Sequence, residues 1–102
     1  MVHKILHKDN GSKGEFFIEE DCKNIAEMTY AWVGRNQFII DYTWVDESLR
    51  GQNIGQNLLN FAVNYAREKN VKIIPRCPFV KSIFDKDASI CDVLDSDSLQ
   101  LF

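Results

Sequence analysis

The stretch from residue 45 to 59, VDESLRGQNIGQNLL, has the composition of an anion-binding loop that leads into a helix. It holds Arg50, Gly51 and Gly55, and it lies between a β-rich segment and an amphipathic one. The first turn of a helix has unpaired backbone N–H groups and the positive end of the helix dipole. Glycine allows a phosphate to approach the backbone, and arginine adds charge-assisted bonds. The pattern predicts a diphosphate site over residues 52–56; alternatively, both glycines serve only turns and packing.

A cysteine gives the second candidate for chemistry. Cys77 lies in a short segment between Pro75 and Pro78, next to Arg76, directly after an expected strand. A nearby cation and a helix N-terminus favour a thiolate, which is a nucleophile. From the spacing alone, the favoured interpretation is a buried structural thiol, since free cysteine packs as a small apolar residue.

The remaining cysteine and histidine residues suggest no metal site. The three cysteines have wide spacings without a CxxC pair, and both histidines lie near the N-terminus: Cys22, Cys77, Cys91, His3 and His7. This set matches no zinc pattern. We therefore expect no metal, free thiols and a reducing, cytoplasmic location.

The elements that position these residues can be predicted from periodicity. Strands are expected at 2–7, 15–19, 26–33 and 37–45, and the last of these is apolar on both faces, as in a central strand. A helix should run from 54 to about 68–70, followed by a strand at 71–74 and short helices at 79–84 and about 88–94. The order predicts an α+β fold with a mixed sheet: an antiparallel β-meander, then a parallel β-α-β crossover and a short C-terminal helix.

Length and charge limit the possible partners. The 102 residues, 45% of them hydrophobic, suit a single compact domain over 1–102. The net charge of -3 shows no basic excess, so we expect no nucleic-acid partner, and no apolar run is long enough for a membrane span. Roughly residues 86–102 form an acidic tail, because five aspartates and one lysine lie between 85 and 102. We expect a monomer or a weak dimer.

Two motifs carry a resemblance to a known family. The spacing V-x-x-x-x-R-G-x-x-I-G-x-x-L-L resembles the coenzyme A pyrophosphate motif of the Gcn5-related N-acetyltransferases (GNAT), Q/R-x-x-G-x-G/A, with Asn53 in place of the first glycine. Residues 74–80 read I-P-x-C-x-[FY]-V, which is similar to the short, single-domain branch of that family. Residues 26–30 and 40–43 add to this resemblance, which covers nearly the whole chain and weakens after Asp85.

The resemblance implies a GNAT-like fold and an N-acetyltransferase that passes acetyl from acetyl-CoA to an unknown amine, either a small molecule or a lysine side chain. It places the coenzyme in a V-shaped gap between the strands at 37–45 and 71–74. Cys77 would lie near the thioester as nucleophile or proton donor. Two alternatives are a non-catalytic acyl-coenzyme A binding module and a structural interaction domain. The implied coenzyme-binding residues are Thr43, Val45, Arg50, Gly51, Gln52, Asn53, Ile54, Gly55 and Gln56.

Side chains of the two longest strands are also candidates. Glu27 and Asp41 are interpreted as exposed carboxylates or as general bases for an ammonium substrate. Tyr42 and Trp44 are expected to pack in the sheet, with a hydrogen bond from Tyr42 to the thioester sulfur as the alternative. Both histidines are expected to face solvent.

Overall fold

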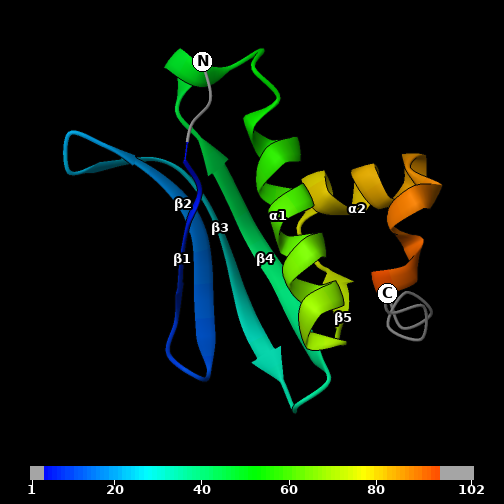
Figure 1. The fold of residues 1–102 in the computed structure, drawn as a ribbon. Helices are drawn as coiled ribbons and strands as arrows, with labels where there is room; N and C mark the ends of the chain where they lie inside the picture. The colour runs from blue at the N-terminus through cyan, green and yellow to red at the C-terminus, as the bar shows by residue number, and fades with distance from the viewer. Residues whose placement is uncertain (1–3, 95–102) are drawn as a thin grey trace.

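Five strands form one mixed sheet, and the two α-helices lie together on one side of it (Figure 1). The computed structural model describes residues 4–94. The elements in chain order are β1 (Leu6–Asp9), β2 (Lys13–Glu20), β3 (Lys23–Val33), β4 (Gln37–Val45), the 3-10 helix η1 (Glu47–Leu49), α1 (Ile54–Lys69), β5 (Lys72–Pro75), α2 (Pro78–Lys86) and the 3-10 helix η2 (Ala88–Val93).

The strands follow each other in space in the order β1-β2-β3-β4-β5, and only the β4–β5 pair is parallel. This confirms the predicted meander and crossover, with β4 inside the sheet. The first strand lies later than predicted, because Asp9 pairs with Gly14 and the turn follows at residues 10–12. Asn10 stabilises that turn by accepting from the backbone N–H groups of Ser12 and Lys13. Residues 2 and 3 of the predicted strand are outside the described residues.

The parallel β4–β5 pairing is short. It ends where Ile40 pairs with Pro75, and the backbone N–H groups of Arg76 and Cys77 then both donate to the Ile40 carbonyl, at 3.2 and 3.0 Å. Residues 41–45 of β4 therefore continue without a β5 partner. This leaves an open edge of β4 directly beside Cys77.

A β-bulge changes which residues of β4 face the helices. Thr29 pairs with Tyr42 but Tyr30 pairs with Ile40, so Asp41 is the extra residue and is not opposite any β3 residue in the strand register. An extra residue reverses the side-chain alternation. As a result, Tyr42 and Trp44 lie on the face away from the helices. They are 49% and 37% exposed, so the expectation that they pack in the sheet is wrong.

Helix α1 covers the sheet with the apolar stripe that the sequence predicts. Its buried residues are Ile54, Gly55, Leu58, Leu59, Ala62, Val63 and Ala66. They share one hydrophobic core with the inner face of β2–β4, with Val80 and Phe84 of α2, and with Ile90 and Val93 of η2. Asn70 ends α1 in a left-handed conformation, and its N–H donates to the carbonyls of Ala66 and Arg67.

A polar cluster lies at the end of the core where α1 stops. The buried Tyr30 hydroxyl donates to Asp9 Oδ2 at 2.5 Å and lies 2.6 Å from His7 Nε2. The single proton of the Tyr30 hydroxyl is donated to Asp9, so His7 Nε2 is the donor in its contact with the Tyr30 oxygen. Trp32 Nε1 also donates to Asp9 Oδ2, at 2.8 Å. The expectation that His7 faces solvent is therefore wrong: its ring is half-buried and stacks on Phe16. His3 lies outside the described residues.

The predicted acidic tail is only partly described. Of its aspartates, Asp92 forms a two-pronged ion pair with Arg67 of α1, and its carbonyl accepts from Lys72 Nζ. Asp95 and Asp97 lie outside the described residues. Among residues 4–94, no helix is both long and apolar enough to cross a membrane.

Candidate active site

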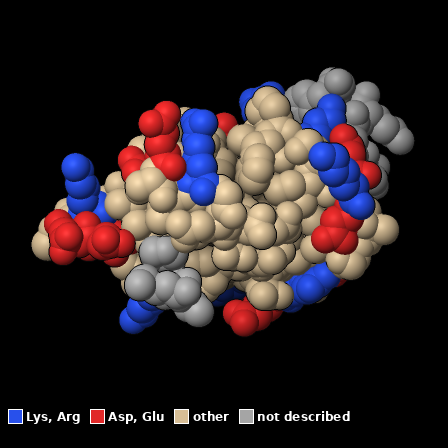
Figure 2. All heavy atoms as spheres, turned by 90° about the horizontal axis from the view of Figure 1, so that it is seen from above, with Lys and Arg blue, Asp and Glu red and all other residues tan. Residues whose placement is uncertain are grey.

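A cavity of about 510 Å³ opens where the end of β4, the loop before α1 and helix α2 meet. Its lining residues are Thr43, Val45, Leu49, Arg50, Gly51, Asn53, Ile54, Gly55, Gln56, Phe79, Ser82, Ile83 and Lys86. Figure 2 views this end of the molecule and shows a broad uncharged surface with charged side chains around its rim. Eight of the nine predicted coenzyme-binding residues line the cavity, and Gln52 does not.

The loop between β4 and α1 has a defined backbone. Asp46 caps η1 by accepting from the Ser48 hydroxyl and N–H, and these two bonds hold the pKa of its carboxyl below the usual value. Gly51 has a φ of 85°, which favours glycine. Asn53 has a φ of 58° and ψ of 31°, the left-handed conformation that asparagine tolerates. The residue that replaces the first motif glycine therefore keeps the backbone turn.

The first turn of α1 supplies hydrogen-bond donors to this cavity. The first bond of the helix runs from the Asn57 N–H to the Asn53 carbonyl at 3.0 Å. The N–H groups of Ile54, Gly55 and Gln56 precede it, so they have no partner within the helix. All three residues line the cavity.

Gly55 is needed for close packing between the helices. A Cβ atom at this position would lie 2.5 Å from Phe79 Cζ. The Phe79 ring is 42% exposed and lies over the start of α1. The absence of a side chain at residue 55 therefore allows the Phe79 ring to pack directly against the N-terminus of α1.

The cavity is suited to an anion by charge as well as by backbone. Arg50 and Lys86 line it, and no aspartate or glutamate does. Both basic side chains are exposed and approach from different elements, the loop and the last turn of α2. A ligand with an extended apolar part and phosphate groups matches this lining, since the cavity is also lined by the apolar residues Val45, Ile54 and Ile83.

Cys77, the residue before α2, does not itself line the cavity. Its side chain is 7% exposed, and its Sγ lies 3.7 Å from Thr43 Oγ1. Thr43 in turn lines the cavity, so the thiol adjoins it through one hydroxyl. Cys22 and Cys91 are exposed elsewhere on the molecule.

Sequence reasoning missed the contribution of α2. Phe79, Ser82, Ile83 and Lys86 line the cavity, together with Leu49 of η1. Their spacing of three and four residues is that of one helix face, and this signal was available in the sequence. Two other candidates, Glu27 and Asp41, lie outside this cavity.

Comparisons with known proteins agree with this geometry. A family model described as GCN5-related N-acetyl-transferase matches residues 15–93. A solution structure described as a GCN5-like N-acetyltransferase, from Staphylococcus aureus, is 39% identical with a TM-score of 0.70, over 90% of this chain and 87% of that one. None of the curated proteins searched matches significantly.

More distant structures share the fold. A ribosomal-protein-alanine N-acetyltransferase from Brucella melitensis is 14% identical with a TM-score of 0.61, over 74% of this chain and 62% of that one. A Clostridium acetobutylicum protein solved with acetyl-CoA is 22% identical with a TM-score of 0.60, over 72% of this chain and 55% of that one.

Proposed function

Because the chain belongs to the GCN5-related N-acetyltransferase family, we propose that it uses acetyl-CoA to acetylate an amine and that the cavity between α1 and α2 holds the coenzyme. The observation that carries this proposal is the cavity itself. It joins two basic side chains and the unpaired N–H groups of a helix start to a strand edge next to a cysteine. When bound, acetyl-CoA would supply an acetyl group activated as a thioester.

The residues divide the task of binding between them. Arg50 and the N–H groups of residues 54–56 bind the diphosphate, where the helix dipole also favours negative charge. Lys86 adds a second cation from the last turn of α2. Thr43 and Val45 of β4 would lie against the arm that carries the thioester. A backbone N–H of residues 41–45, which have no β5 partner, would stabilise negative charge that develops on the acetyl oxygen.

A chemical role for Cys77 is supported by the contact of its thiol with Thr43, which lines the cavity. The amine nitrogen forms a bond to the acetyl carbon, the carbon–sulfur bond breaks, and the amine loses one proton. In one route, the Cys77 sulfur displaces coenzyme A from the acetyl carbon while its proton passes to the coenzyme thiolate, and the amine then displaces Cys77, whose sulfur takes up the proton that the amine loses. In the other route, the amine displaces coenzyme A directly, Cys77 gives its proton to the departing sulfur, and the Cys77 thiolate takes up the proton that the amine loses.

Calorimetric titration with acetyl-CoA tests the binding site, with desulfo-coenzyme A as competitor. We expect one-to-one binding in the micromolar range, about -8 kcal/mol. Arg50→Ala and Lys86→Ala should each weaken it several-fold, while Lys81→Ala should not, since Lys81 is exposed on the same helix outside the cavity. Equal affinities in all four proteins would reject the site.

A transfer assay tests the role of Cys77. Cys77→Ala should lower kcat while the affinity for acetyl-CoA stays within about twofold, because the thiol adjoins the cavity without lining it. Cys91→Ala, at an exposed thiol, is the matched control. A Cys77→Ala protein that transfers acetyl as fast as the parent would exclude both chemical roles.

A further inference from the structure

Helix α2 presents one face to the coenzyme cavity, and the two ends of that face differ in chemistry. The residues of this face that line the cavity are Phe79, Ser82, Ile83 and Lys86. The Phe79 ring lies against Gly55 in the first turn of α1, whereas Lys86 lies in the last turn of α2. Seven residues of helix span about 10 Å along the axis. The ammonium-bearing end of α2 is therefore set apart from the helix start where we place the diphosphate.

The charge of Lys86 is not neutralised by a neighbouring side chain. Within residues 4–94, Lys86 forms no ion pair. Asp85 and Asp87 flank it in sequence, but neither lines the cavity. The nearby Ser82 hydroxyl donates to the Phe79 carbonyl at 2.7 Å, so its proton is not available to an anion. An anionic group beside this half of α2 therefore has Lys86 as its charged partner.

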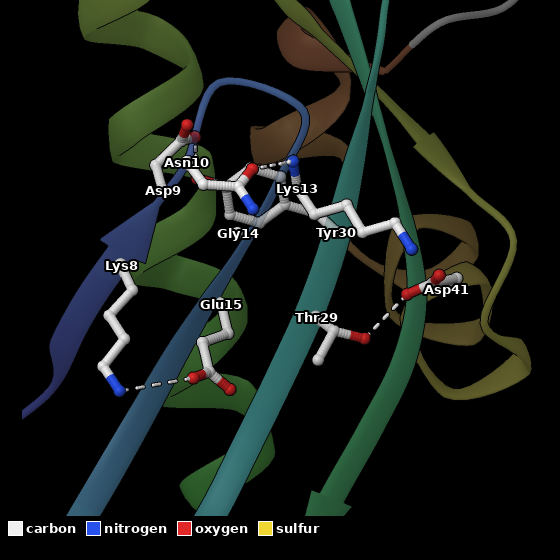
Figure 3. Close-up of a pocket in the computed structure, with 9 residues that line it drawn as sticks. All are labelled: Lys8, Asp9, Asn10, Lys13, Gly14, Glu15, Thr29, Tyr30 and Asp41. Carbon is white, nitrogen blue, oxygen red and sulfur yellow. Dashed lines mark hydrogen bonds and ion pairs between the residues drawn. The ribbon is translucent and has the colours of Figure 1, made fainter.

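A second cavity, of about 520 Å³, has a different charge. It lies on the outer face of the sheet, away from α1, and Figure 3 shows Lys8 of its lining directed toward Glu15. The distance between these two charged groups is 4.0 Å. The carboxylates of Asp9 and Asp41 also line this cavity, and they oppose the binding of a phosphate. The cavity between α1 and α2, which no carboxylate lines, is the better anion site of the two.

Coenzyme A carries negative charge at two separate places. One is the diphosphate, and the other is the 3′-phosphate, which the ribose holds apart from the diphosphate. A phosphate monoester has nearly two negative charges at neutral pH and three acceptor oxygens. Arg50 and the N–H groups of residues 54–56 provide for the diphosphate at the start of α1. The 3′-phosphate then needs a cation elsewhere in the cavity lining, and Lys86 is a cation at a second place.

We propose that Lys86 binds the 3′-phosphate of the coenzyme and thereby selects free coenzyme A thioesters over acyl donors that have the same pantetheine arm but lack this phosphate. The inference rests on the proposed function and adds the class of acyl donor. Helical side chains lean toward the N-terminus of their helix, which favours a position of the Lys86 ammonium over the turn that contains Ser82. An ammonium is a compact charge with three donors, which suits a phosphate monoester.

Calorimetric titrations with coenzyme A and with 3′-dephospho-coenzyme A test the inference. The parent should bind coenzyme A about threefold to tenfold more tightly, and Lys86→Ala should bring the two affinities to within about twofold of each other. Lys86→Arg should keep the preference, because it keeps the charge. Arg50→Ala should weaken both ligands by a similar factor and leave their ratio as in the parent. Lys81→Ala, at an exposed lysine of α2 outside the cavity, should bind both as the parent does.

Phosphorus NMR of bound coenzyme A provides an independent readout. The 3′-phosphate signal should titrate at lower pH in the complex than in the free coenzyme, because a nearby cation favours the doubly charged form, and Lys86→Ala should remove this difference. Equal binding of the two ligands by the parent, an undiminished preference in Lys86→Ala, or an unshifted phosphate titration would overturn the inference and leave the proposed function standing. A parent that binds neither ligand would reject the proposed function, and this inference with it.

Discussion

Replacing Tyr30 by phenylalanine should destabilise the protein through the polar cluster at the end of the core. The substitution removes a hydroxyl that donates to the Asp9 carboxylate and accepts from His7. A hydrogen bond to a charged group contributes about 1.5–3 kcal/mol. Asp9 is exposed and can bind water instead, which reduces the loss to about 1–2 kcal/mol. For a domain of this size, the expected fall in Tm is about 4–16 °C.

Thermal unfolding followed by circular dichroism measures this difference, with urea unfolding as a second method. Tyr42→Phe is the matched control, because the Tyr42 ring is 49% exposed and loss of its hydroxyl should change stability by less than about 0.5 kcal/mol. A Tyr30→Phe protein that unfolds within about 2 °C of the parent would refute the reasoning. It would mean that water replaces both bonds without cost.

Two further predictions concern pH and the loop before α1. Burial lowers the pKa of His7 from its ordinary value of 6.5. Burial alone would raise the pKa of Asp9, but the hydrogen bonds that its carboxylate accepts, first of all from Tyr30, have the larger combined effect and lower that pKa. Both groups bind protons more readily in the unfolded chain, so stability should fall as pH decreases below about 6.5; a free energy of unfolding that is constant from about pH 7 to 4 would contradict this. Gly51→Ala should lower Tm, because the positive φ of residue 51 strains an alanine by about 1–2 kcal/mol; a Cβ there meets no atom within 4 Å, so no steric clash adds to this loss. Asn53→Gly should be neutral or stabilising, because glycine adopts the left-handed conformation without strain. The opposite order of the two Tm values in differential scanning calorimetry would be inconsistent with the left-handed conformations.

Most of the fold could be predicted because its signals are local. The run at 37–45 is β-rich along its whole length, and α1 begins at Ile54 as the periodicity indicates. The loop between them was recognised by residue types that act through the backbone. The conformational preferences of glycine and asparagine and the charge of arginine do not depend on contacts with distant parts of the chain.

The differences between expectation and structure come from non-local pairing. The bulge at Asp41 depends on how β3 and β4 align, and no property of Asp41 itself indicates it. One extra residue then decides that Tyr42 and Trp44 face solvent. His7 is similar, because its environment is made by Tyr30, 23 positions away in sequence.

The short parallel pairing between β4 and β5 has a consequence for the order in which substrates bind. The cavity at α1 and the cavity beside Asp41 open on opposite faces, and the unpaired stretch of β4 separates them. A coenzyme bound in the cavity at α1 would leave the outer face of the sheet uncovered, so it would not block an amine that approaches from that side. Addition and release would then follow a random order, and double-reciprocal plots at several fixed acetyl-CoA concentrations should intersect when both substrates must be present together.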